Sequence, residues 1–288
     1  VQRVGPSTGM PTRTQQADIL TAAYASHGDT RHVLLFPSEP NECFELAVKA
    51  FDLADRLQTP VLVLLDLDIG MNDWMTDAFA WDDSYQHDRG KVHDAEQLEA
   101  MADWGRYQDR DGDGIPYRTL PGTHPSKGAY FTRGTSHDEN ARYTEDGHIH
   151  ARVLDRLTKK FEHAATIMPK AAVSGNSSSI GLIYFGATTP AVHEALDILE
   201  QAGERPDALR IKAFPFGEEI KAFADAHETL FVIEQNRDAQ MRGLLVNEGK
   251  LDPAKLVSLL NYDGMPLTAA YVVEHVRSHL SQSKVAAE

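Results

Sequence analysis

A near-continuous apolar run constrains the fold of this chain more than any other feature. Residues 61–68 read V-L-V-L-L-D-L-D. Parallel sheets bury both faces of their strands and so favour uninterrupted apolar runs of this kind. A second short run, His32–Phe36, precedes it, and the residues between the two have helical spacing. Strand, helix and strand in this order predict an open α/β sheet with a right-handed crossover.

The helix between these strands is predicted to begin after Ser38, the expected cap, with Glu39 and Glu42 near its positive end. Helical spacing also predicts a shorter helix over Gln15–Ala25, before the first strand. In the longer helix, the apolar face that we expect to be buried consists of Phe44, Ala47, Val48, Phe51 and Ala54.

Residues 71–170 lack this regular pattern and are rich in Asp, Gly, His, Arg and Tyr. Within them, only Ala95–Trp104 and Ile149–Thr166 have helical spacing. An irregular stretch of this length is uncommon in a compact domain unless it serves a function or an interface. We therefore predict an insertion that wraps over the domain or over a neighbouring subunit.

Regular α/β patterning resumes after a polar stretch, Ser174–Ser179, which we interpret as a linker. The predicted strands are Gly181–Phe185, Leu209–Ala213 (alternating, hence half-exposed) and Thr229–Ile233. One predicted helix has Thr188 or Thr189 as its cap and stops at Gly203; another covers Glu218–Ala226. We predict two α/β domains, residues 1–173 and 180–288.

Composition excludes several classes of protein. The formal net charge of −15 argues against a nucleic-acid partner, which requires a basic surface. No apolar run approaches the ~20 residues of a membrane span, and the amino terminus has no secretory signal. The first residue is not Met, so we expect a fragment or a processed product. A single cysteine, Cys43, excludes an internal disulfide and fits a reducing cytoplasm.

The segment Gln2–Thr12, Q-R-V-G-P-S-T-G-M-P-T, is too rich in glycine and proline to form a helix or the interior of a strand. We predict a rigid loop. Arg3 supplies a planar fork suited to a carboxylate or phosphate, and Ser7 and Thr8 supply hydroxyl donors. The loop is therefore a candidate for anion recognition. The alternative is a structural role, because a tight turn with a solvated arginine also accounts for the glycine, proline and arginine residues.

Asp109, Asp111 and Asp113, followed by Gly114, match the first half of a calcium-binding loop. The bidentate glutamate expected at the twelfth position is Leu120, so the complete pattern fails. We favour a solvated turn over metal binding.

Several other polar residues have a structural and a functional interpretation. His137, Asp138, Glu139, His148 and His150 fit no zinc spacing, so we favour a polar surface loop. His27 could face an active centre or serve a local turn. We expect Cys43 in the core. Glu234 lies at the end of a predicted strand, a position at which ligands bind in open α/β sheets. We nevertheless favour an interface or structural role for it.

The string Gly-Pro-Ser-Thr-Gly-Met-Pro-Thr, residues 5–12, resembles the signature loop of the alpha subunits of 2-oxoacid:ferredoxin oxidoreductases, especially the 2-oxoglutarate type. Further segments resemble this family in the same order, so the resemblance covers nearly the whole chain. They are Phe-Pro-Ser-Glu-Pro-Asn-Glu-Cys-Phe (36–44), Asp-Leu-Asp (66–68), Asp-Gly-Ile-Pro-Tyr-Arg (113–118), Leu-Pro-Gly-Thr (120–123), Gly-Thr-Ser-His-Asp (134–138) and Val-Ile-Glu-Gln-Asn (232–236).

This resemblance implies a fold, an activity and partners. The fold would be the latter half of a thiamine pyrimidine-binding domain with an insertion at 71–170, then a smaller transketolase-C-terminal-like domain. The activity would be oxidative decarboxylation of a 2-oxoacid to an acyl-CoA, with electrons passed to ferredoxin. Thiamine diphosphate and Mg²⁺ would be held mainly by a partner beta subunit. That partner would also carry a 4Fe-4S cluster, since a cluster usually needs about four thiolates.

The resemblance further implies that Arg3 binds the substrate carboxylate and that Thr8 hydrogen-bonds the substrate. No catalytic residue is assigned, because the family's upstream Tyr-Pro-Ile-Thr-Pro motif and activating glutamate have no counterpart here, and no activity is expected of the isolated chain. Which 2-oxoacid is used stays open, since one arginine reads only the carboxylate that all 2-oxoacids share. A pyruvate-type relative and a non-catalytic assembly subunit are the alternatives.

Overall fold

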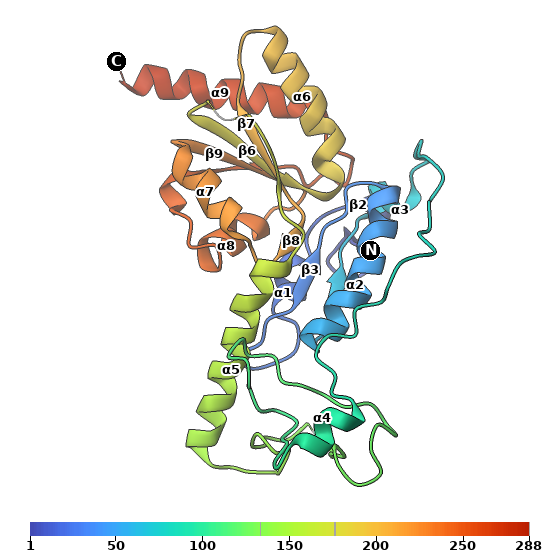
Figure 1. The fold of residues 1–288 in the computed structure, drawn as a ribbon. Helices are drawn as coiled ribbons and strands as arrows, with labels where there is room; N and C mark the ends of the chain where they lie inside the picture. Colours follow the sequence, from blue (N-terminus) through green and yellow to red (C-terminus); the bar gives the residue numbers. More distant parts are fainter. Residues whose placement is uncertain (133, 176, 288) are drawn as a thin grey trace. The chain divides into compact units, whose positions relative to one another are not determined.

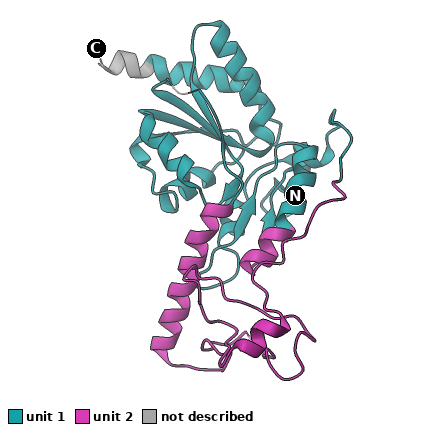
Figure 2. Cartoon of the chain, viewed as in Figure 1, with its two compact units in different colours: residues 1–50, 61–81, 168–288 teal, residues 51–60, 82–167 magenta. Residues whose placement is uncertain are grey.

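A computed structural model describes residues 1–132, 134–175 and 177–287 of the chain. The fold is α/β, as predicted. Its residues form two compact units (Figure 2): unit 1 comprises residues 1–50, 61–81 and 168–288, and unit 2 comprises 51–60 and 82–167. The domain boundaries inferred from the sequence, 1–173 and 180–288, stay a prediction.

A three-stranded sheet in unit 1 contains both of the strands predicted from the amino-terminal pattern. Its order is β4 (Val61–Val63), β3 (Val33–Leu35) and β8 (Ala213–Phe214). β3 and β4 are parallel, as predicted, whereas β8 pairs with β3 in the antiparallel sense. β3 is fully buried, but β4 lies at the edge of this sheet and is only half-buried. The prediction that this strand is buried on both faces was wrong for Val61–Val63, since packing leaves all three side chains partly exposed.

Helix α2 (Pro40–Leu57) follows β3, and α1 (Ile19–Ala23) precedes it. Two details of the predicted helix were wrong. The Ser38 hydroxyl does not cap the helix but donates to the Glu42 carboxylate at 2.8 Å. The buried face consists of Leu46, Leu53 and Leu57, and Phe51 is 70% exposed.

A five-stranded sheet in unit 1 accounts for most of the predicted carboxy-terminal pattern. Its strand order is β10 (Leu256–Leu260), β9 (Thr229–Glu234), β6 (Ile180–Phe185), β7 (Asp207–Ile211) and β5 (Ala172–Ser174). All neighbours are parallel except β5 and β7. Part of the predicted linker Ser174–Ser179 thus belongs to an edge strand; Asn176 lies outside the described residues.

Helices cover both faces of this sheet (Figure 1). On one face lie α6 (Thr189–Gln201) and α9 (Ala269–Ala287); on the other lie α7 (Glu218–Ala226) and α8 (Gln240–Asn247). The short 3-10 helices Gly186–Thr188 and Pro253–Lys255 lie in connections. Burial of aliphatic side chains drives this packing: Leu182, Phe231 and Ile233 of the sheet contact Val192 and Val272 of the helices.

Unit 2 contains little regular structure, as predicted for an insertion. Its described residues include the short helix α4 (Ala95–Ala100) and the long helix α5 (Gly147–Ile167). One loop passes very close to α5, because a Cβ on Gly114 would lie 2.3 Å from the Lys160 backbone nitrogen. Gly114 also has a φ of +79°, a conformation that glycine alone adopts readily. Among the described residues, no helix is long and apolar enough to cross a membrane.

Candidate functional site

The candidate loop forms a hairpin at the carboxyl end of the parallel strands. Strands β1 (Arg3–Val4) and β2 (Met10–Thr14) pair in the antiparallel sense. The Gln2 backbone extends the sheet beyond β4: its N–H donates to Leu65 O at 2.7 Å, and its carbonyl accepts from Leu67 N at 3.1 Å. Open α/β sheets bind ligands at the carboxyl ends of their strands. The hairpin therefore lies where a ligand site is expected.

The prediction of a loop over Gln2–Thr12 was wrong at its ends, because Arg3–Val4 and Met10–Thr12 lie in the paired strands β1 and β2. Residues 5–9 between them form a loop with a restricted backbone. Ser7 has a φ of +57° and Gly9 a φ of +50°. A Cβ at Gly9 would lie 2.0 Å from the Val4 carbonyl oxygen, so no other residue fits there without moving the backbone.

The structure brings two of the three predicted site residues together. Arg3 Nη1 donates to the Thr8 carbonyl oxygen at 3.3 Å across the loop. Within the described residues, the side chain of Ser7 makes no hydrogen bond of this kind, but all three residues are exposed on the same hairpin. The guanidinium is thus tethered at one nitrogen and open to solvent elsewhere, which suits it to bind an anion.

Gln16, which the sequence reasoning did not single out, connects the strand ends beneath the hairpin. It is 1% exposed. Its Nε2 donates to Asp66 Oδ2 and to Phe185 O, both at 3.3 Å, and its Oε1 accepts from Gln235 N at 3.1 Å. One side chain therefore joins the ends of the three-stranded and the five-stranded sheets of unit 1. Only its proximity to the motif loop could have suggested this role.

Asp66 caps helix α3 (Leu67–Met71), because its carboxylate accepts from the backbone nitrogens of Asp68 and Ile69. It is 1% exposed. Burial raises the pKa of Asp66 to about 6, although the hydrogen bonds from Ile69 and Gln16 oppose the shift. A carboxyl that titrates near neutral pH therefore lies directly under the hairpin.

The segment Glu234–Asn236 has a structural role at the end of β9. Glu234 is fully buried and accepts from the Met241 and Arg242 backbone nitrogens at the start of α8. Asn236 Nδ2 donates to Gln16 O at 3.0 Å. The structural interpretation of Glu234 agrees with these bonds.

A buried Asp207–His227 pair lies beside Ser177, Ser178 and Ser179, and could be mistaken for a nucleophilic triad. His227 Nε2 lies 3.1 Å from Asp207 Oδ2, and Nδ1 lies 2.6 Å from Phe223 O. Both ring nitrogens therefore face acceptors, and neither can take a proton from a serine. The arrangement does not support nucleophilic catalysis.

The candidate calcium loop is occupied by an ammonium group. Lys91 Nζ lies 2.7 Å from Asp111 Oδ2 and 2.8 Å from Asp113 Oδ1. Asp109 instead accepts from the Gly112 backbone nitrogen and closes a turn. Lysine supplies the positive charge that a cation would supply, so these residues do not fit a metal.

The remaining candidates are dispersed. His137 stacks on Tyr107 with ring centroids 3.9 Å apart, and His27 lies in an exposed turn. Cys43 is half-buried, and burial with nearby carboxylates raises its thiol pKa to about 11. Among the described residues, no group of three or more His, Cys, Asp or Glu side chains could hold a metal ion.

Comparison with known proteins supports the resemblance seen in the sequence. Residues 1–103 match the family described as pyruvate flavodoxin/ferredoxin oxidoreductase, thiamine diphosphate-binding. The chain is 32% identical over 282 residues to 2-oxoacid:ferredoxin oxidoreductase 2, subunit alpha, of Aeropyrum pernix. It is 30% identical over 253 residues to the 2-oxoglutarate synthase subunit KorA of Methanothermobacter thermautotrophicus. The chain is a relative of the 2-oxoacid:ferredoxin oxidoreductase alpha subunits.

These alpha subunits are longer than the chain. The matches cover 96% and 82% of this chain but 42% and 61% of the two relatives. The fold agrees with a solved 2-oxoglutarate:ferredoxin oxidoreductase from Magnetococcus marinus, which has 2-oxoglutarate, coenzyme A and succinyl-CoA bound. That comparison has a TM-score of 0.84 at 24% identity and covers 96% of this chain and 47% of the other. The predicted resemblance is confirmed.

Proposed function

We propose that this chain is part of the alpha subunit of a 2-oxoacid:ferredoxin oxidoreductase and that its hairpin binds the carboxylate of the 2-oxoacid. The observation that carries this proposal is the Arg3 guanidinium, tethered to Thr8 O at 3.3 Å on an exposed loop at the carboxyl end of β4. The second nitrogen edge of a guanidinium can pair with a carboxylate bidentately, which orients the adjacent keto carbon.

The complete enzyme would decarboxylate the 2-oxoacid oxidatively to an acyl-CoA, with coenzyme A as co-substrate and ferredoxin as electron acceptor. A partner beta subunit would hold thiamine diphosphate, Mg²⁺ and a 4Fe-4S cluster. Thiamine diphosphate would stabilise the carbanion left by loss of carbon dioxide. The part of this chain would be to bind and orient substrate through Arg3, Ser7 and Thr8. We favour 2-oxoglutarate, since the similar proteins include a 2-oxoglutarate synthase subunit.

The test is steady-state kinetics of the complete enzyme with Arg3→Lys, using dye reduction with 2-oxoglutarate and with pyruvate as substrates. Lysine keeps the charge but loses the planar fork, so we expect the KM for the preferred 2-oxoacid to rise by about tenfold. Arg205→Lys is the matched control, because Arg205 is exposed and pairs with Glu200 outside the hairpin.

An unchanged KM for Arg3→Lys would contradict the assignment. A higher specificity for pyruvate than for 2-oxoglutarate in the unmodified enzyme would instead identify a pyruvate-type enzyme. A complex that assembles but turns over neither substrate would favour the remaining alternative, a non-catalytic assembly subunit.

A further inference from the structure

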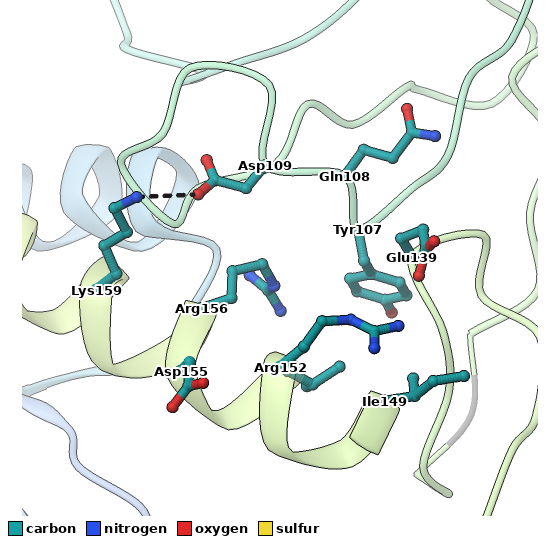
Figure 3. Close-up of a pocket in the computed structure, with 10 residues that line it drawn as sticks. Tyr107, Gln108, Asp109, Glu139, Ile149, Arg152, Asp155, Arg156 and Lys159 are labelled. Carbon is teal, nitrogen blue, oxygen red and sulfur yellow. Dashed lines mark ion pairs between the residues drawn. The ribbon is translucent and has the colours of Figure 1, made fainter. Parts of the chain in front are cut away.

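Unit 2 contains a pocket of about 580 Å³ that the proposed function does not use. One wall is a single face of helix α5, from which Arg152 and Arg156 extend toward the ring of Tyr107 (Figure 3). Ile149 and Val153 add apolar surface to this wall. A pocket of this size accommodates a small organic molecule.

Buried cations lie behind the pocket. Arg106 is 9% exposed, and its guanidinium carbon lies 4.8 Å from the centre of the Tyr107 ring. Its Nη2 donates to Gln58 Oε1 at 2.6 Å. Within the described residues, its Nε and Nη1 have no hydrogen-bond partner, and neither has Nε of Arg156. Buried guanidinium groups of this kind are normally paired with an anion, since unpaired N–H donors are costly to desolvate.

A further cation, Lys160, adds to the positive potential. Burial, together with the charges of Arg156 and Arg106, lowers its pKa to about 8. The charges of the residues that line the pocket balance: Arg152, Arg156 and Lys159 face Asp109, Glu139 and Asp155. The excess of two positive charges comes from Arg106 and Lys160, which lie behind the lining next to Tyr107 and Arg156.

We propose that this pocket binds a phosphate dianion, free or as a monoester, between the guanidinium groups of Arg152 and Arg156. A phosphate carries about −1.5 to −2 charges at pH 7, which matches the excess, whereas one carboxylate would leave a positive charge unbalanced. Guanidinium groups bind phosphate oxygens in a bidentate manner, and the Tyr107 ring would contact the organic part of an ester.

The test is calorimetric titration of the full chain at constant ionic strength with phenyl phosphate, inorganic phosphate and benzoate. We expect saturable binding of phenyl phosphate and binding of benzoate weaker by at least about tenfold, because benzoate carries one charge only. If phenyl phosphate binds more tightly than inorganic phosphate, the ligand is an ester; if they bind equally, it is free phosphate. Both results support the site.

Variants localise the binding. Arg152→Gln should weaken phenyl phosphate binding by about tenfold or more. Arg156→Lys, which keeps the charge, should weaken it less than Arg156→Gln. Arg142→Gln is the control, since Arg142 is exposed in the same unit and does not line the pocket. Melting temperatures establish that each variant is folded.

The proposal is overturned if folded protein shows no saturable binding of either phosphate. It is equally overturned if benzoate binds as tightly as phenyl phosphate, or if Arg142→Gln weakens binding as much as Arg152→Gln does.

Discussion

At the scale of single residues, the sequence shows which groups can ionise but not what each one contacts. Arg3 is exposed, whereas Asp66 is buried under the same loop and hydrogen-bonds Gln16. Both occur in motifs that resemble one family, and their sequence contexts do not separate their roles. Burial distinguishes the two roles, because removal from water changes the free energy of charging a side chain.

Asp66 predicts a dependence of stability on pH. Burial raises its pKa from 3.8 to about 6, so the folded protein binds this proton more tightly than the unfolded chain. The resulting stabilisation is complete below pH ~4 and is lost as the pH rises through 6. Relative to Asp66→Asn, the unfolding free energy of the unmodified protein should fall by roughly 2–3 kcal/mol between pH 4 and 7.

Urea denaturation at a series of pH values measures this difference. Asp29→Asn is the control, since Asp29 is exposed. Parallel pH profiles for the unmodified protein and Asp66→Asn would show that Asp66 does not titrate in this range.

At the scale of elements, one ion-paired group explains two discrepancies between prediction and structure. Alternating charges at Arg210 and Lys212 predicted a half-exposed strand, yet the chain here passes from β7 to β8 with Leu209, Ile211 and Ala213 buried. Arg210 and Lys212 are instead paired with Glu42 on α2, at 2.5 and 3.0 Å. Glu42 thus lies on the buried face of α2, one turn before Leu46, although the apolar pattern predicted another face.

Removing the Glu42 charge should therefore be costly. Burial opposes its ionisation, but the hydrogen bonds from Arg210 and Ser38 outweigh this and lower the pKa of Glu42 to about 2. Glu42→Gln should reduce the unfolding free energy at pH 7 by about 3 kcal/mol, because the guanidinium is left buried without its counterion. The loss should diminish as the pH falls from 4.5 toward 2, where the unmodified side chain also becomes neutral.

Chemical denaturation of Glu42→Gln beside Glu45→Gln, an exposed neighbour on α2, isolates the effect of the pair. Equal stabilities of the two variants would mean that the pair contributes nothing.

At the scale of the whole molecule, the two compact units are stabilised differently. The sheet of β10, β9, β6, β7 and β5 satisfies its backbone groups through strand pairing. In unit 2, many loop backbone groups rely on side chains, such as Asp138 Oδ1, which accepts from the nitrogens of Asn140 and Arg142. Contacts between side chains and exposed loops open more easily than sheet ladders.

Hydrogen exchange followed by mass spectrometry should show this difference. Amides in residues 101–132 and 134–146 should exchange at least about a hundredfold faster than those of β6 and β9, because local opening there needs little unfolding. Peptides of α5 serve as a control within the same unit, since helical hydrogen bonds should protect them. Equal protection of the loops and the central strands would contradict this account.

The sequence by itself determined the α/β class, the helices Glu218–Ala226 and α5, the turn that contains Ser7 and Thr8, and the resemblance to one enzyme family. Local spacing and turn chemistry are sufficient for these features, because they depend on residues close together along the chain. The helical spacing of Arg152, Arg156 and Lys159 was also present in the sequence and could have indicated a basic face on α5.

Only the tertiary structure decided the contacts between distant residues. It placed Lys91 between Asp111 and Asp113, Glu42 against Arg210, and Gln16 between the ends of two sheets. It also showed that Arg106 is buried and that its Nε and Nη1 have no hydrogen-bond partner in the part of the chain that the structure describes. Charge and polarity make each of these side chains look solvent-exposed in the sequence. Their contacts are with partners many residues away, which spacing along the chain does not encode.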